Sequence, residues 1–189
     1  VGVAGAAGLL GHFSKDLPDY SQLQDYEPPV MTRVHAADGS LVGEYARERR
    51  LYIPIQAVPK QVINGFLAAE DKNFYEHGGL DFTSIARAAF NYAQNYGSSR
   101  RPQGASTITQ QVAKNFLLTN ELSVTRKVKE ALLALKIERT YSKDKILELY
   151  LNEIYLGLGA YGIAAASLVY FYKSVNELTV PDVAYLAAL

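Results

Sequence analysis

From Pro59 to the last residue the chain carries a nearly unbroken series of helical patterns, and this feature constrains the fold most. Apolar residues recur at three- and four-residue spacing in seven segments, namely residues 59–71, 81–95, 106–118, 123–139, 143–156, 161–172 and 181–189. In residues 32–55 apolar and polar residues alternate instead, as they do in a β-strand, and Asp38-Gly39 is a typical turn sequence. The predicted fold class is therefore mainly α, with a small N-terminal β-hairpin appendage.

Composition sets bounds on the function. The chain has 189 residues, of which 49% are hydrophobic, enough for one good core and an appendage. Nineteen basic and nineteen acidic residues balance, so net charge argues neither for nor against a nucleic-acid partner. There is no cysteine, which excludes a disulfide framework and a cysteine-based metal site.

Both ends of the sequence look cut. Residues 1–13 are apolar apart from His12, but they are shorter than the ~20 residues that a membrane-spanning helix needs. We expect them to be the end of a transmembrane or signal-anchor segment, the alternative being a small apolar helix of the fold. Residues 14–58 then form a connector and hairpin region. The final helical pattern opens at Pro181 and stops before any cap, so we expect a helical domain over residues 59–189 that is truncated at its C-terminal end.

A carboxylate stands in the apolar stripe of the first helical segment. Glu70 is the next position on the stripe that is marked by Ile63, Phe66 and Leu67. Burial and the nearby helix C-terminus would both disfavour its charged form, a property that general acid/base catalysis uses. The alternative is that Glu70 caps the helix or pairs with a lysine at its rim. Asp71 is expected to face outward or cap locally, and His77 to be a turn histidine.

The stretch "GASTITQQVAKN", residues 104–115, pairs a hydroxyl-rich turn with a short helix. Thr107 and Gln110 fit a capping box, while Ile108, Val112 and Phe116 are expected to face inward. The outer face would then carry a polar ridge of Gln110, Gln111, Lys114 and Asn115. Amides and an ammonium beside a helix start suit a ligand that bears phosphate or sugar, although a solvated face is the simpler alternative.

A second carboxylate follows two cations in "TRKVKEALLALKIE", residues 125–138. Arg126 and Lys127 precede Glu130 by four and three residues, an order that contributes only ~0.3 kcal/mol as a structural pair. A cationic cluster around a carboxylate makes more sense beside a diphosphate, where it stabilises departing negative charge. The opposite face is expected to be buried through Val124, Val128, Leu132 and Leu135.

Five stretches occur in the order of the five motifs of peptidoglycan glycosyltransferases: "EDKNFYEHGG", "GASTITQQVAKN", "RKVKE", "KILELYLNEIYLGLGAYGI" and "AASLVYFYK". Over about residues 52–189 the chain resembles the glycosyltransferase family 51 domain of class A penicillin-binding proteins. The hairpin and connector resemble those of the bifunctional 1A-type members. The resemblance implies a lysozyme-like helical domain with a membrane-associated jaw.

The resemblance also implies an activity and a set of site residues. The reaction would be polymerisation of lipid II into β-1,4-linked glycan strands, with release of undecaprenyl diphosphate and inversion at the sugar. Glu70 matches the catalytic base and Glu130 the second essential carboxylate. Residues expected to bind substrate, four of them near the donor diphosphate, are Gln111, Lys114, Arg126, Lys127, Ser106, Thr107 and Asn115.

Partners and place in the cell follow from the same resemblance. It implies a lipid-linked glycan strand as ligand, the outer, periplasmic face of the bacterial cytoplasmic membrane as location, and a C-terminal transpeptidase domain in the full chain. Other cell-wall synthesis proteins are further expected partners, and nucleic acid is not. A divalent cation, Mg²⁺ or Mn²⁺, is expected near Glu130, with no organic cofactor.

Two neighbouring segments are expected to work at the membrane and the substrate. Phe82, Ile85, Ala86, Ala89, Phe90 and Ala93 form an apolar stripe that predicts an interfacial jaw helix, the alternative being an ordinary core helix. Residues 96–103 offer nothing to bury and are expected to close over bound diphosphate through Arg100 and Arg101.

Two other function classes are compatible with parts of the sequence. A lysozyme-like cell-wall hydrolase would also use a buried glutamate, but as an acid, and would have no use for a diphosphate-binding cationic cluster. A non-catalytic envelope scaffold would tolerate replacement of Glu70 and Glu130.

Overall fold

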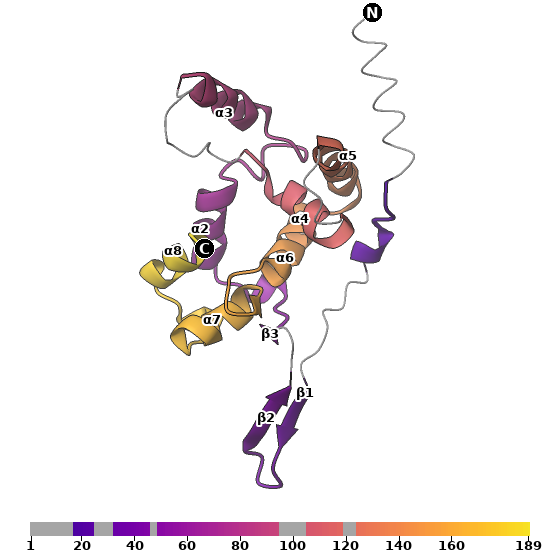
Figure 1. Cartoon of the computed structure of the whole chain (residues 1–189). Coiled ribbons are helices and arrows are strands. Elements are labelled where there is room, and N and C mark those ends of the chain that lie inside the picture. The colour runs from indigo at the N-terminus through magenta and orange to yellow at the C-terminus, as the bar shows by residue number, and fades with distance from the viewer. Residues whose placement is uncertain (1–16, 25–31, 46–48, 95–104, 119–123) are drawn as a thin grey trace, which may run out of the picture. The chain divides into compact units, whose positions relative to one another are not determined.

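The computed structural model describes residues 17–24, 32–45, 49–94, 105–118 and 124–189 (Figure 1). They divide into two compact units, one built on Glu70–Ile146 with residues up to Tyr20, the other on Ser21–Ala69 and Leu147–Leu189. Each of the seven expected segments contains a helix: α2 (Lys60–Glu70), α3 (Phe82–Gln94), α4 (Ile108–Leu117), α5 (Val124–Thr140), α6 (Lys143–Glu153), α7 (Ile163–Phe171) and α8 (Val180–Ala187). The mainly helical fold class is thereby confirmed. The calls on residues 1–13 and 96–103 lie outside the described residues.

The core of the first unit lies where α4 packs against α5. Ile108 and Val112 of α4 are buried, as expected, and Phe116 is half-buried. The prediction that α5 is buried through Val124, Val128, Leu132 and Leu135 is wrong. Val124 is 84% exposed and the other three are only half-buried. The buried face consists of Glu130, Leu133, Ala134 and Ile137. A glutamate opens this i, i+3, i+4, i+7 row, so the sequence disguises it as a polar face.

The second unit packs α2, α6, α7 and α8 with short extended segments. Phe66 of α2 meets Tyr150 of α6 edge to face, with ring centroids 6.4 Å apart. Asn152 of α6 binds the backbone of Ile53 twice, accepting from its N–H and donating to its carbonyl, both at 2.8 Å. Glu148, one turn earlier, accepts from the N–H of Ile55 at 3.0 Å. The two side chains thereby tie the extended segment to α6.

Two small sheets complete the second unit. Strands β1 (Thr32–His35) and β2 (Leu41–Tyr45) pair antiparallel, and Gly39 turns between them with φ of 84°, so the expected hairpin is confirmed. Strands β3 (Arg49–Arg50) and β4 (Ala160–Tyr161) pair in parallel. Sequence analysis missed this second sheet because two residues are too few to show a period. The 3-10 turns η1 (Ser21–Leu23), η2 (Ile55–Ala57) and η3 (Val175–Glu177) lie between the larger elements.

Gly79, in the loop after α2, lies close against the backbone of α5. Its φ is +101°, and a Cβ placed there would lie 2.8 Å from the carbonyl oxygen of Ala134. Only glycine tolerates both the backbone conformation and this approach. The preceding Gly78 has open space around the same position.

Substitution of these two glycines tests the packing of the loop. Gly79→Ala should lower the free energy of unfolding by at least ~2 kcal/mol, because backbone strain and a clash with α5 add together. Gly78→Ala is the matched control and should change it by less than ~0.5 kcal/mol. Urea unfolding followed by circular dichroism measures both, and equal effects would show that the loop does not press on α5.

Candidate active site

The predicted base, Glu70, is the last residue of α2 and is exposed. The expectation that it faces the core is wrong, because the stripe of α2 is buried through Val62 and Phe66 and leaves the helix end outside it. The Glu70 carboxylate accepts a hydrogen bond of 2.7 Å from Nε2 of Gln111, one turn into α4. The structure therefore brings together two of the predicted site residues and leaves the carboxylate open to a reactant.

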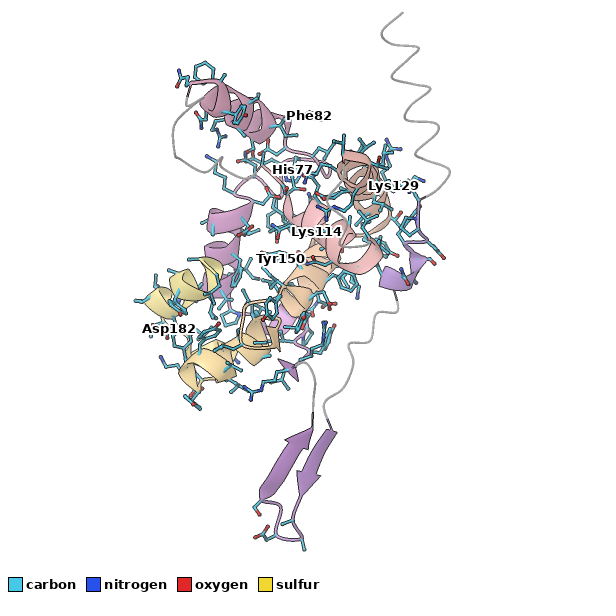
Figure 2. All side chains as sticks on the ribbon, viewed as in Figure 1. His77, Phe82, Lys114, Lys129, Tyr150 and Asp182 are labelled. Atoms are coloured by element: carbon cyan, nitrogen blue, oxygen red, sulfur yellow. The ribbon has the colours of Figure 1, made fainter. Side chains whose placement is uncertain are left out.

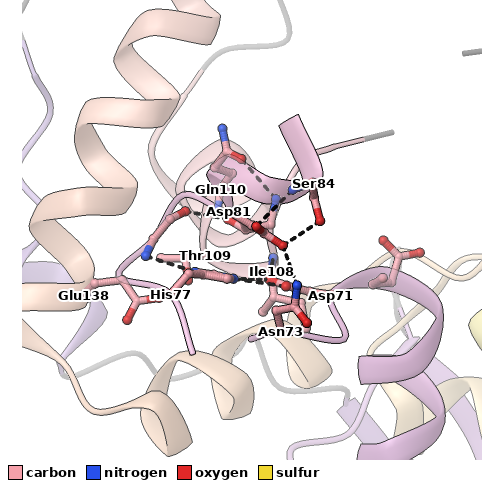
Figure 3. Close-up of polar contacts among 12 residues, drawn as sticks. Asp71, Asn73, His77, Asp81, Ser84, Ile108, Thr109, Gln110 and Glu138 are labelled. Carbon is pink, nitrogen blue, oxygen red and sulfur yellow. Dashed lines mark hydrogen bonds and ion pairs between the residues drawn. The ribbon is translucent and has the colours of Figure 1, made fainter. Parts of the chain in front are cut away.

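Asp71, directly after Glu70, was expected to face outward, but its side chain is buried. It is 6% exposed, and its Oδ2 accepts from the backbone N–H of Ile108, the first residue of α4, at 3.0 Å. His77 contributes a second bond, with Nε2 at 2.9 and 3.0 Å from the two carboxylate oxygens (Figure 3). A buried carboxylate needs such partners, because an unpaired one is costly. Asp71 therefore joins the end of α2, the loop after it and the start of α4.

A second set of polar contacts holds the loop between α2 and α3, which carries His77. Nζ of Lys143 donates to the carbonyl of His77 and to Oε1 of Glu138, both at 2.7 Å. The same Glu138 oxygen accepts from the hydroxyl of Thr109 at 2.6 Å. The ammonium also lies 4.3 Å from the centre of the Phe74 ring. Sequence analysis missed this pair because Lys143 and Glu138 lie on different helices.

The predicted capping box at the start of α4 is confirmed. The Thr107 hydroxyl accepts from the N–H of Gln110 at 3.2 Å, and the Gln110 side chain accepts from the N–H of Thr107 at 3.0 Å. The Thr107 hydroxyl also donates to the carbonyl of Gly79 at 2.7 Å. Both side chains are buried, so Gln110 does not belong to the outer ridge. Thr107, predicted to bind substrate, is placed to hold α4 and has no surface to offer a ligand.

A cationic cluster stands beside the same helix start. Nζ of Lys127 donates to the hydroxyl of Ser106 at 2.8 Å and to Oε1 of Glu130 at 2.5 Å. Glu130 is 2% exposed, whereas the Lys127 side chain is 52% exposed, so the buried carboxylate fixes the position of an accessible lysine. Arg126, on α5 with Lys127 and Glu130, is half-buried. These contacts unite three of the predicted residues, with their polar groups at the N-terminal end of α4.

Lys114 and Asn115 lie on the exposed face of α4. Lys114 lies three residues after Gln111, which places the two on neighbouring turns of one side of the helix. Of the expected outer ridge, Gln111, Lys114 and Asn115 therefore remain.

The start of α3 is fixed by Asp81. Its carboxylate accepts from the hydroxyls of Ser84 and Thr83 at 2.5 Å, from Nδ2 of Asn73 at 2.9 Å and from two backbone N–H groups of the first turn. The hydroxyl of Ser84, followed by that of Thr83, holds the pKa of Asp81 well below its usual range. Asn73 thereby links the loop after α2 to the cap of α3.

The expected divalent cation finds little support in the side chains. Within the described ranges, no group of three or more His, Cys, Asp or Glu residues is placed to hold a metal ion. The Glu130 carboxylate already faces the Lys127 ammonium, whose charge would repel a cation there. These residues do not form a metal site by themselves. A role for Mg²⁺ or Mn²⁺ stays a prediction.

The site is thus an exposed carboxylate and a directed ammonium at the start of one helix, an arrangement suited to group transfer from an anionic leaving group. The family model described as Transglycosylase matches residues 38–189. The chain belongs to the Transglycosylase family, and the resemblance drawn from the five motifs is confirmed. The chain is therefore a peptidoglycan glycosyltransferase domain.

Its relatives include penicillin-binding proteins 1A, in agreement with the predicted subtype. That of Rickettsia conorii is 57% identical over 189 residues, covering 100% of this chain and 24% of the relative. That of Aquifex aeolicus is 53% identical over 175 residues, covering 93% and 24%. The chain therefore spans about a quarter of their length. Among solved structures, penicillin-binding protein 1A from Haemophilus influenzae matches with a TM-score of 0.40 and 26% identity, covering 87% of this chain and 14% of that one.

The Lys143–Glu138 pair supports a test of the layer behind the site. The Glu138 side chain is 7% exposed, so Lys143→Met leaves its charge buried without the ammonium and should cost about 3 kcal/mol of unfolding free energy. Adding Glu138→Gln should recover at least a third of that loss. Lys72→Met, at an exposed lysine, serves as control and should cost less than ~0.5 kcal/mol. Additive losses in the double variant would contradict a direct pairing.

Proposed function

We propose that this chain polymerises lipid II into β-1,4-linked glycan strands and releases undecaprenyl diphosphate. The proposal is carried by an exposed Glu70 that is bound to Gln111 of α4 and by the Ser106–Lys127–Glu130 cluster at the start of the same helix, in a member of the Transglycosylase family. A base and a phosphate-binding cation are the two groups that this reaction requires.

In the proposed mechanism Glu70 removes the proton from the 4-hydroxyl of the acceptor GlcNAc. That oxygen attacks the anomeric carbon of the donor MurNAc, and the bond from this carbon to the α-linked diphosphate breaks on the opposite face. One displacement gives the β-1,4 linkage with inversion and needs no covalent enzyme intermediate. Gln111 holds the Glu70 carboxylate by its Oε2 atom, which leaves Oε1 for the acceptor hydroxyl.

The leaving diphosphate is proposed to lie against the cationic cluster. Lys127 carries most of this role, because Glu130 and Ser106 fix its ammonium beside the start of α4. Arg126 and Lys114 are the further cations, and Asn115 offers an amide to the sugars. Glu130 is buried and acts through Lys127.

The proposed place of the reaction is the outer face of the bacterial cytoplasmic membrane. Helix α3 supports this, because none of its residues is buried. Phe82, labelled on α3 in Figure 2, and Phe90 are both exposed, at 71% and 62%. The alternative of an ordinary core helix is wrong for this structure. We propose that α3 lies in the membrane interface as the jaw of a lysozyme-like domain. In the described part of the chain, no helix has the length and apolar character to cross a bilayer.

The whole protein is proposed to be bifunctional. Its penicillin-binding relatives are about four times longer than this chain, which leaves room for a transpeptidase domain after Leu189. Other cell-wall synthesis proteins are the further proposed partners.

The two carboxylates should respond differently to substitution. Glu70→Gln keeps the shape but cannot accept a proton, so lipid II polymerisation should fall by ~10² to 10⁴, with donor-analogue binding nearly unchanged. Glu130→Gln removes the charge that directs Lys127, so it should lower both turnover and donor affinity. Polymerisation assays with labelled lipid II and titration of a lipid-diphosphate analogue measure the two effects. Substantial activity in Glu70→Gln would overturn the assignment, and cleavage of finished glycan would favour a hydrolase.

Helix α3 gives a separate test of membrane contact. Phe82→Asp with Phe90→Asp should weaken binding to anionic liposomes at least ~10-fold while preserving helicity, because both rings are already exposed. Arg87→Asp, on the other side of α3, is a control for charge alone. Loss of helicity in the double variant would show that the rings stabilise the fold instead.

A further inference from the structure

We propose that His77 and Asp71 are positioning residues for Glu70, and that His77 acts only in the tautomer that carries its proton on Nε2. The proposal rests on the proposed function, since Glu70 is the group that is positioned.

Backbone geometry assigns the tautomer. The N–H of Gly79 can only donate, and its nitrogen lies 3.2 Å from Nδ1 of His77. Nδ1 must therefore present its lone pair and carries no proton. Nε2 then carries the proton and donates to the Asp71 carboxylate, whose oxygens lie at 2.9 and 3.0 Å (Figure 3). The opposite tautomer would set a proton on Nδ1 against the N–H of Gly79 and leave Asp71 without this donor.

The His77–Asp71 bond affects the position of Glu70, because Asp71 and Glu70 each form a hydrogen bond to α4. Asp71 accepts from the N–H of Ile108, while Glu70, its neighbour, accepts from Gln111, three residues further along α4. Two adjacent residues at the end of α2 therefore bind two positions one turn apart on α4. If Asp71 rotates away, only the exposed contact to Gln111 still fixes the carboxylate of Glu70. A misplacement of ~1 Å can cost ~10² in rate.

Burial excludes a direct chemical role for His77 in this arrangement. Its side chain is 8% exposed, that of Asp71 is 3%, and the ring packs edge to face on Phe74. Lys143 binds the His77 carbonyl and leaves the ring nitrogens to Gly79 and Asp71. The pair is therefore placed to orient neighbouring groups.

Nitrogen NMR of the His77 ring tests the tautomer without any substrate. At neutral pH we expect a proton-free Nδ1 and a protonated Nε2, identified by the couplings of each nitrogen to the ring carbon-bound protons. The reverse tautomer, or a ring protonated on both nitrogens, would overturn the proposal. A protein that shows the expected tautomer but does not polymerise lipid II would overturn the proposed function and leave the ring assignment standing.

Two amide substitutions test the positioning role. The side-chain nitrogen of glutamine reaches approximately where Nε2 lies, whereas that of asparagine reaches only the position of Nδ1. His77→Asn should therefore lower kcat by ~10- to 100-fold with KM for lipid II changed less than about threefold, and His77→Gln should restore most of kcat. Glu76→Gln, exposed on the same loop, is the control and should leave both constants unchanged.

Equal kcat in the two amide variants would overturn the proposal, as would a loss confined to KM. Thermal unfolding of both variants is measured alongside. If His77→Asn does not fold, the ring tautomer and the kcat of His77→Gln relative to wild type decide: a Gln variant with less than a tenth of wild-type kcat would contradict the role.

Discussion

The buried carboxylate of Asp71 is the interaction on which the site depends. It accepts from the first N–H of α4 and from the ring of His77. The loop that carries His77 is held in turn by Lys143 and by Thr107, which donates to the carbonyl of Gly79. The start of a helix has N–H groups without intrahelical partners, and a carboxylate suits them both as acceptor and as charge. One hydrogen-bonded group thus fixes where Glu70 stands relative to α4.

This arrangement separates rigidity from reactivity. Asp71, Thr107 and Glu130 are buried and spend their hydrogen bonds inside the protein, whereas Glu70, Lys127 and Lys114 are exposed. Each exposed group except Lys114 has a described partner that directs it, Gln111 for Glu70 and Glu130 for Lys127. The proposed polymerisation needs reactive groups that are open to the strand and also preorganised.

The sequence predicted helices well and the orientation of charged residues poorly. Period and capping located every helix from α2 to α8, including the Thr107–Gln110 box, because these depend on neighbouring residues. The positions of Asp71 and Glu70 depend on partners 37 and 41 residues away in the sequence, and the burial of Glu130 depends on an unexpected helix face. In α5 the buried face was predicted wrongly, because glutamate is rarely buried and Glu130 was therefore assigned to the exposed face. The family motifs predicted the segments that contribute to the proposed site, and the contacts between those segments are the basis for the role proposed for each residue.

Hydrogen exchange at the Ile108 amide tests the central claim most directly. With Asp71 as acceptor, this amide should exchange as slowly as Val112, four residues further along α4, although it lies at the exchange-prone first turn. In Asp71→Ala, Ile108 should exchange at least ~10-fold faster while Val112 keeps its protection. Fast exchange of Ile108 in the wild-type protein, or the same rate with and without the Asp71 carboxylate, would contradict the account.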